Sequence, residues 1–285
     1  MAWSEDTLSG PEGEDWRVPV SELEERQTNF AALLREAGIE AALIQNPVDL
    51  YYFAGGRQNA SLLIPAAEGK TPTQYVRRSL RRAKHEAGGD DAPHQVEAFP
   101  RMKEFSSAIG CTPALQLGSI PSSFADRFSS AFGVGGDCTN LVHQQREVKS
   151  EWELEMMRCA AETQLEMFNA LAEYGKEGMS ELELVAEAET VSRKAGFGGN
   201  INLRRFPMQC DRGVIVSGRA GGIPSFFDAA VGGTGPYPGA GMGAGFSKIK
   251  ADEPVLVDLL HSHRGYLVDM TRMFVAGSLS QQWQD

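Results

Sequence analysis

Two aspartates near the end of the sequence have surroundings that suit metal chemistry. Asp258 follows the apolar run 254–257, and Asp269 is flanked by apolar residues in a second run. A charge in a buried strand is costly unless it is paired or binds a cation. The polar stretch 261–265 contains a glycine and predicts a turn, which makes the two runs neighbouring antiparallel strands. Their carboxylates can then face each other and offer hard oxygen ligands from a rigid platform.

Such a pair would form half of a bridging site for two metal ions. Two ions held about 3.5–4 Å apart can activate a water molecule and polarise a carbonyl group, which leads to hydrolysis of peptide-type bonds. Residue chemistry alone leaves a structural role equally open, because Asp269 could instead bond to Arg272 or to backbone amides.

Other patterns are less specific. His261 and His263 form an H-x-H pattern suited to Zn, Fe, Ni or Cu, but both lie in the predicted turn, so we expect them to be solvent-exposed. The glycine-rich run 232–245 spells G-x-G-x-x-A, yet no strand precedes it and it lacks the Lys-Ser/Thr of a P-loop. We interpret it as an irregular active-site loop whose glycines allow close backbone approach.

The elements that must position these residues begin with an α/β pattern. Residues 1–20 are acidic and aperiodic, which predicts a flexible tail. Ser21 and Glu24 form a predicted capping box for a helix that runs to Gly38. Further along we expect strands at 41–44, 62–65 and 139–147 and a helix at 121–132. This alternation indicates an α/β (α+β) fold.

The second half is expected to bring two helices against several strands. An amphipathic helix is predicted from Lys149 to Tyr174, and a capping box at Ser180 and Glu183 starts another that reaches Gly196. Strands are predicted at 201–210, 213–217, 255–260 and 266–275.

Composition narrows the function classes. The 285 residues are 42% hydrophobic and 23% charged, as in an ordinary globular protein, and carry a net charge of −11. That charge repels phosphate backbones and anionic lipid, so we expect no nucleic acid and no membrane as partner. The four cysteines form no C-x-x-C pair, and no secretory signal is visible. We therefore expect reduced thiols and a cytoplasmic protein.

The stretch VLVDLLHSHRGYLVDMTRMFVAG resembles the metal-binding signature of the pita-bread metallopeptidase family, which contains Xaa-Pro aminopeptidase, Xaa-Pro dipeptidase, methionine aminopeptidase and creatinase. The shared pattern is an Asp, ten intervening residues, and a second Asp followed by Thr-Arg, here Asp258, Asp269 and Thr271-Arg272. Residues 147–160 are similar to the start of the catalytic domain of the Xaa-Pro branch. Residues 21–146 resemble its creatinase-type N-terminal domain.

The resemblance implies a set of expectations. Residues 21–146 would form a creatinase-like domain, and 147–285 a pita-bread catalytic domain that stops part-way. Asp258 and Asp269 would be metal ligands for two divalent ions, Mn, Co or Zn, in a hydrolase that cleaves peptide bonds with a metal-activated water. A peptide or small-molecule substrate and a homodimer are implied as partners. No catalytic side chain is assigned among these residues.

Departures from the family pattern shape the function prediction. The family has a further His and two Glu ligands in the second half of its domain, and this sequence ends at Asp285 before them. The stretch 238–243 contains no His where the family has a substrate-binding one, and Leu260 replaces the usual Gly. We therefore expect the chain by itself to be inactive. Two alternatives stay open: a creatinase-like or lyase-like enzyme on a small non-peptide molecule, or a catalytically silent scaffold that binds a partner.

Overall fold

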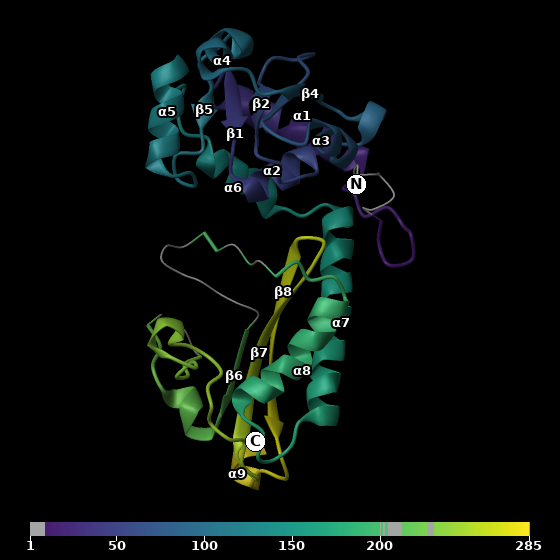
Figure 1. Ribbon diagram of the computed structural model, residues 1–285, viewed down its shortest axis with the longest axis vertical. Helices are drawn as coiled ribbons and strands as arrows, with labels where there is room; N and C mark the ends of the chain where they lie inside the picture. The colour runs from purple at the N-terminus through teal and green to yellow at the C-terminus, as the bar shows by residue number, and fades with distance from the viewer. Residues whose placement is uncertain (1–8, 200, 202, 205–212, 227–230, 285) are drawn as a thin grey trace. The chain divides into compact units, whose positions relative to one another are not determined.

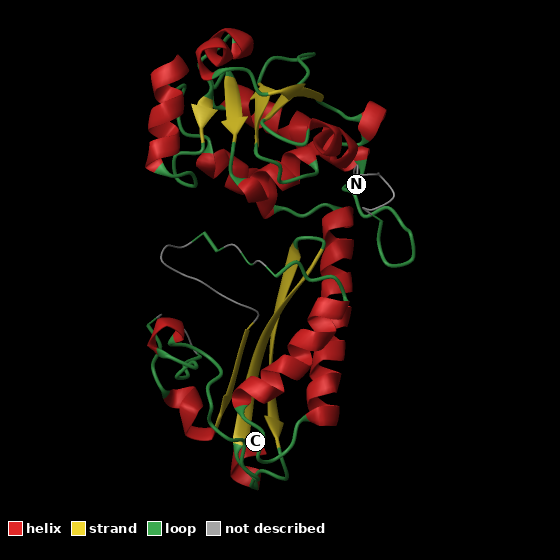
Figure 2. Ribbon diagram, viewed as in Figure 1, coloured by secondary structure: helices red, strands yellow, loops and turns green. Residues whose placement is uncertain are grey.

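The computed structural model describes residues 9–199, 201, 203–204, 213–226 and 231–284. The chain divides into two compact units, Met1–Lys149 and Ser150–Asp285 (Figures 1 and 2). None of the helices in the described part of the chain has the length and apolarity needed to cross a membrane. Cys111, Cys138 and Cys159 are free thiols, and Cys210 lies outside the described residues.

The first unit is a mixed sheet with helices against both faces. Its strand order is β4-β3-β2-β1-β5, where β1–β2 and β2–β3 are antiparallel and β1–β5 and β3–β4 are parallel. Its elements are α1 (Val20–Glu36), β1 (Ala41–Ile44), α2 (Pro47–Ala54), β2 (Ala60–Pro65), β3 (Thr73–Val76), α3 (Leu80–Glu86), η2 (Gly89–Asp91), β4 (Gln95–Ala98), α4 (Met102–Ile109), β5 (Ala114–Leu115), α5 (Ser122–Phe132) and α6 (Thr139–Glu147).

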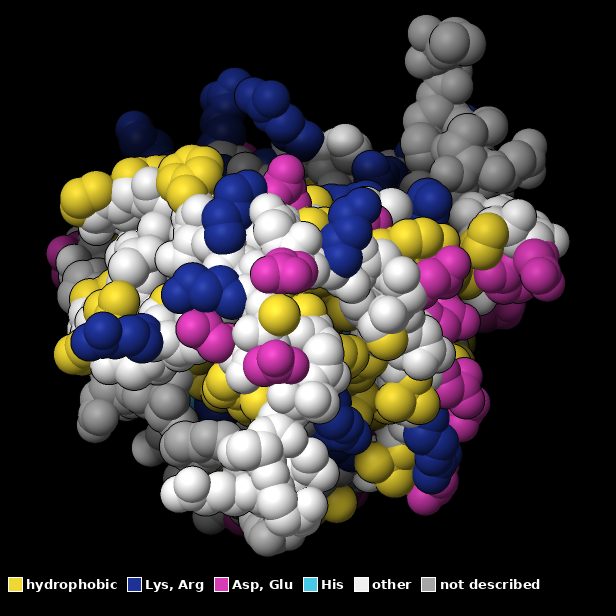
Figure 3. Space-filling model, turned by 90° about the horizontal axis from the view of Figure 1, so that it is seen from below, with side chains coloured by type: hydrophobic (Ala, Val, Ile, Leu, Met, Phe, Trp, Pro, Cys, Tyr) yellow, Lys and Arg dark blue, Asp and Glu magenta, His cyan; other side chains and the backbone are white. Residues whose placement is uncertain are grey.

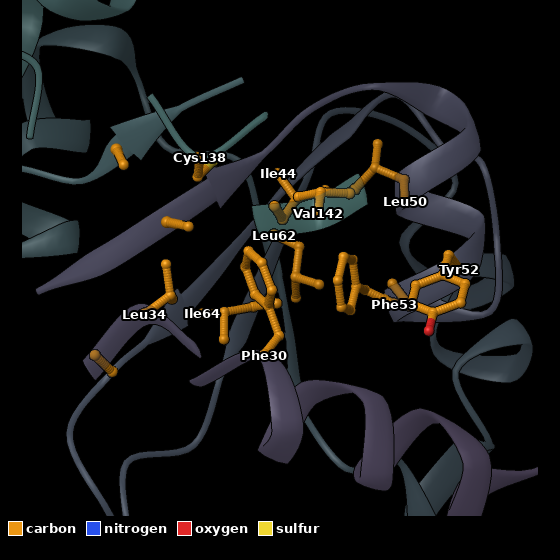
Figure 4. Close-up of a cluster of buried hydrophobic side chains, with 14 residues drawn as sticks. Phe30, Leu34, Ile44, Leu50, Tyr52, Phe53, Leu62, Ile64, Cys138 and Val142 are labelled. Carbon is orange, nitrogen blue, oxygen red and sulfur yellow. The ribbon is translucent and has the colours of Figure 1, made fainter. Parts of the chain in front are cut away.

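Side chains alternate between two buried clusters across this sheet, as the period of a strand requires. One cluster joins Ile44 and Leu62 of the strands to Phe30 of α1 and Phe53 of α2 (Figure 4). The other face is covered by α4 and α5, whose aromatic side chains pack on the strands. All four residues of β1 are buried, which confirms the strand predicted at 41–44.

Two sequence predictions fail in this unit. The helix α1 begins after Pro19, and no side chain caps it, so the predicted capping box at Ser21 is wrong. Pro19 enters the helix with extended backbone angles, and Val20 already has helical ones. The segment 139–147 is the helix α6 rather than a strand, because Cys138 and Val142 share one helical face and both enter the core.

The second unit packs two helices on a three-stranded antiparallel sheet, ordered β6-β7-β8. Its elements are α7 (Glu151–Tyr174), α8 (Glu181–Lys194), β6 (Gly213–Ser217), η3 (Gly218–Gly222), η4 (Pro238–Ala240), β7 (Pro254–His263), β8 (Tyr266–Val275) and α9 (Gln281–Gln284). The capping box at Ser180 is confirmed, and Ser150 forms a second one with Glu153. The strand predicted at 201–210 falls largely outside the described residues.

Alternate residues of β7 separate the core under the helices from the other face of the sheet, where Leu256 packs with Val214, Val216 and Met242. Val255, Val257 and Leu259 are buried against α7 and α8, whereas the residues between them are only half-buried. The strand β8 shows the weaker burial of an outer strand, with Leu267 and Met273 exposed. On the surface drawn in Figure 3, acidic and basic side chains are interspersed with apolar ones.

Candidate metal centre

Both predicted metal ligands lie on the sheet face that points away from α7 and α8. Asp258 is directly opposite Thr271, and Asp269 is directly opposite Leu260. The two aspartates are therefore diagonal neighbours on one face of an antiparallel pair, within reach of each other. The structure thus brings the predicted pair together across β7 and β8, with Thr271 rather than Asp269 in the opposing position.

The two carboxyl groups influence each other. Partial burial, the negative charge of Asp258 and a side-chain hydrogen bond with Asp258 together raise the pKa of Asp269 to about 6. Two negative charges on neighbouring side chains disfavour simultaneous ionisation, and a bound cation removes that penalty. The donor set of two adjacent carboxylates also matches the preference of hard divalent ions. On both counts these residues fit part of a metal site.

The described residues supply only these two ligands. No group of three or more His, Cys, Asp or Glu side chains in the described part of the chain could hold a metal ion. Mostly apolar side chains border the carboxylates instead: Leu256 is paired with Met273 on one side, and on the other Leu267 is paired with the small polar Ser262. The carboxylate pair is therefore a small polar patch on a largely apolar face.

The alternative partner of Asp269 faces the other way. Arg272 lies in the register that points to the helices, where its guanidinium carbon is 5.6 Å from the centroid of the Phe168 ring. It also donates a hydrogen bond of 2.7 Å to the carbonyl oxygen of Thr271. A structural ion pair between Asp269 and Arg272 is therefore not formed.

The strand that carries Asp258 is held from behind by buried polar groups. The Gln164 amide of α7 donates to the carbonyl oxygen of Leu259, and Gln164 is fully buried. His261 is also fully buried, with Nδ1 at 2.8 Å from Ser192 Oγ of α8. These contacts hold β7 against the helices at Leu259 and His261, the first and third residues after Asp258.

The prediction that His261 and His263 are exposed turn residues is wrong. The strand β7 continues through His263, and the turn consists of Arg264 and Gly265, both with positive φ. Burial, and secondarily the charge of His263, lower the pKa of His261 to about 4. His261 therefore sits on the helix side of β7, opposite the face that carries the aspartates.

Glu181 anchors the glycine-rich segment. This fully buried carboxylate accepts hydrogen bonds from the backbone nitrogen and hydroxyl of Ser217 at 2.7 and 2.9 Å, and from the backbone nitrogen of Gly245 at 2.8 Å. A parallel bridge between Gly233 and Gly243 closes the segment on itself. The run 232–245 is thus an irregular loop, as expected, and Glu181 ties it to the end of β6, whereas its place at an active site stays a prediction.

Sequence reasoning overlooked three of these residues. Thr271 was noted as part of a motif but given no role, and its proximity to Asp258 could have been found from the hairpin register. Glu181 follows the N-cap Ser180, where an acidic residue is ordinarily explained by the helix dipole. Gln164 gives no local signal, because its partner is 95 positions away.

Comparison with known families covers nearly all of the chain. Residues 155–285 match metallopeptidase family M24. Residues 26–148 match the creatinase/prolidase N-terminal domain.

Individual relatives agree with these matches. A Xaa-Pro dipeptidase of Pyrococcus horikoshii is 23% identical over 266 residues, which is 92% of this chain and 67% of the relative. The solved structure of a Xaa-Pro dipeptidase from Bacillus anthracis superposes with a TM-score of 0.72 at 18% identity, covering 92% of this chain and 67% of that one. A Thermotoga maritima X-Pro aminopeptidase gives a TM-score of 0.68 at 22% identity, with 90% and 67% covered. These structures share the fold of this chain.

Proposed function

Because the chain belongs to the pita-bread metallopeptidase family, we propose that Asp258 and Asp269 are ligands of a divalent metal centre in a hydrolase acting on Xaa-Pro peptides. The observation that carries this proposal is the diagonal placement of the two carboxylates on the face of β7 and β8 that points away from α7 and α8. Relatives named as Xaa-Pro dipeptidases and an X-Pro aminopeptidase support the substrate class. Mn, Co or Zn is the proposed metal.

The domain assignment is part of the same proposal. We assign residues 21–146 to the creatinase-like N-terminal domain and 147–285 to the catalytic domain, with an acidic tail before them. The matched ranges 26–148 and 155–285 support this division. A homodimer and a cytoplasmic location remain predictions, and size-exclusion chromatography with light scattering tests the first.

The chain's own residues have defined tasks in this proposal. Asp258 and Asp269 hold the cation from neighbouring strands of one hairpin. A bound divalent ion would make a water molecule more acidic and polarise the scissile carbonyl. In the described residues the set of ligands stops at two, so we expect tight metal binding and hydrolysis to need further ligands.

Metal titration tests the assignment directly. We expect Mn²⁺ binding to the 285-residue chain, followed by the electron paramagnetic resonance of free Mn²⁺, to be weak and to disappear in Asp258→Asn and in Asp269→Asn. Asp90→Asn, an exposed aspartate of the first unit, is the control and should bind as the unchanged chain does. Binding that is equal in all four proteins would refute the site.

A substrate panel tests the reaction class. We expect no release of proline from Ala-Pro or Gly-Pro by the chain in excess Mn²⁺, because the described residues supply only two ligands. Release that requires both aspartates would refute the predicted inactivity and support the peptidase assignment. Turnover of creatine or another small zwitterion but not of dipeptides would favour the alternative enzyme class.

A further inference from the structure

The neighbour of Asp258 across the strand pair is a hydroxyl group. Thr271 lies directly opposite Asp258, and its Oγ1 donates a hydrogen bond to Asp258 Oδ1 at 2.5 Å. A charge-assisted O–H···O bond of this length is strong for a side-chain pair. A threonine hydroxyl has a single proton, so this bond commits the donor capacity of Thr271 to Asp258.

The hydrogen bond restricts how the carboxylate can turn. An aspartate on a strand otherwise rotates freely about its last torsion, which is broad and weakly restrained. With Oδ1 held by Thr271, the plane of the carboxylate is fixed and Oδ2 remains free of the threonine. The neighbours of Asp258 along its own strand and on β6, Leu260 and Val214, are apolar and offer no such donor, and the diagonal neighbour Asp269 is the second carboxyl group of the proposed pair.

Strand preference does not account for a threonine here. β-branched residues fit strands, and valine would serve that purpose at least as well. The Thr271 side chain is exposed, so its methyl group adds little to the core. Arg272 cannot replace it as a partner of Asp258, because the guanidinium lies over Phe168 on the opposite face.

We propose that Thr271 is a positioning residue that orients the Asp258 carboxylate for the metal ion. The inference rests on the proposed function, because it needs Asp258 to be a ligand. Residues that orient a ligand from behind typically change metal affinity about 10–100-fold when they are replaced. The part of Thr271 that matters is the hydroxyl, and this separates the proposal from a packing role.

Two substitutions distinguish the effect of the Thr271 hydroxyl from the effect of its branched shape. Thr271→Val keeps the branched shape and removes the hydroxyl, whereas Thr271→Ser keeps the hydroxyl and removes the methyl group. We expect Mn²⁺ affinity, measured by the resonance of free Mn²⁺, to fall about 10–100-fold in Thr271→Val and to stay within about threefold in Thr271→Ser. Thr163→Val is the matched control, because that hydroxyl bonds only its own helix at the Cys159 carbonyl.

The outcomes separate this inference from the site itself. If Asp258→Asn abolishes Mn²⁺ binding and Thr271→Val binds like the unchanged chain, the positioning role is wrong and the site stands. If Mn²⁺ binding does not depend on Asp258, both proposals fall. Circular dichroism and thermal unfolding check that each variant is folded. Should Thr271→Val not fold, Thr271→Ser still decides, since an affinity loss as large as that of Asp258→Asn would overturn the role of the hydroxyl.

Discussion

A buried histidine of the first unit should make the protein acid-sensitive. His94 is 4% exposed, and burial lowers its pKa from the ordinary 6.5 to about 4. The hydrogen bonds give a second reason. The Gln27 amide nitrogen donates to the Phe53 carbonyl at 2.7 Å and contacts His94 Nδ1 at 2.9 Å. The second N–H of the Gln27 amide therefore points at His94 Nδ1. A proton added to Nδ1 would be directed against that N–H.

The sign follows from proton linkage. The unfolded chain binds the His94 proton below pH 6.5, whereas the folded chain binds it only below about pH 4. Stability from this group is therefore complete above pH 6.5, declines as the pH falls, and is lost below about pH 4. Each pKa unit is worth about 1.4 kcal/mol, so the loss amounts to about 3 kcal/mol.

Urea unfolding from pH 7.5 to 4, compared between the unchanged chain and His94→Gln, measures this loss. Because the chain has two compact units, unfolding of the first should be followed by hydrogen exchange in the β2 segment 60–65. The stability difference between the two proteins should change by about 3 kcal/mol over this range. A difference for His94→Gln that does not vary with pH would refute the reasoning.

Substitutions at three further positions test side chains that stabilise the fold. Glu181→Ala should destabilise the second unit by about 2–4 kcal/mol, because buried donors of Ser217 and Gly245 lose their acceptor, and Glu181→Gln should recover part of this in urea unfolding. Ser150→Ala should cost about 1 kcal/mol, since it removes the capping box of α7, and should speed hydrogen exchange in the first turn of that helix. Phe105→Ala should lower the stability of the first unit by about 3–5 kcal/mol, measured by the same unfolding assay, since Phe105 is fully buried among aromatic rings.

Local sequence signals located most elements of both units. The strand predicted at 266–275 has those bounds in the structure, and the Ser180 capping box starts α8 where expected. Errors arose where a short segment fits two patterns. The segment 139–147 has too few apolar residues to fix a period, and tertiary packing of Val142 selected the helix.

The hairpin shows a different limit. The polar letters of 261–265 predict a turn, yet only Arg264 and Gly265 form it, because a two-residue turn with positive φ matches the twist of the strands. The extra length of β7 turns His261 inward to Ser192, a partner 69 positions earlier. A polar side chain that finds a buried partner across the fold looks the same in the sequence as one that faces water.

Whether a contact is local or spans the fold also decides which residues of the candidate site can be predicted from the sequence. Asp258, Asp269 and Thr271 belong to one hairpin, so spacing and register are enough to place them on one face. From the helices, Gln164 bonds to the hairpin and Glu181 bonds to the glycine-rich run 232–245, with partners 95 and 64 positions away. The ligands can therefore be proposed from a motif, but the groups that hold the ligand strand in place become visible only once the helices are packed on it.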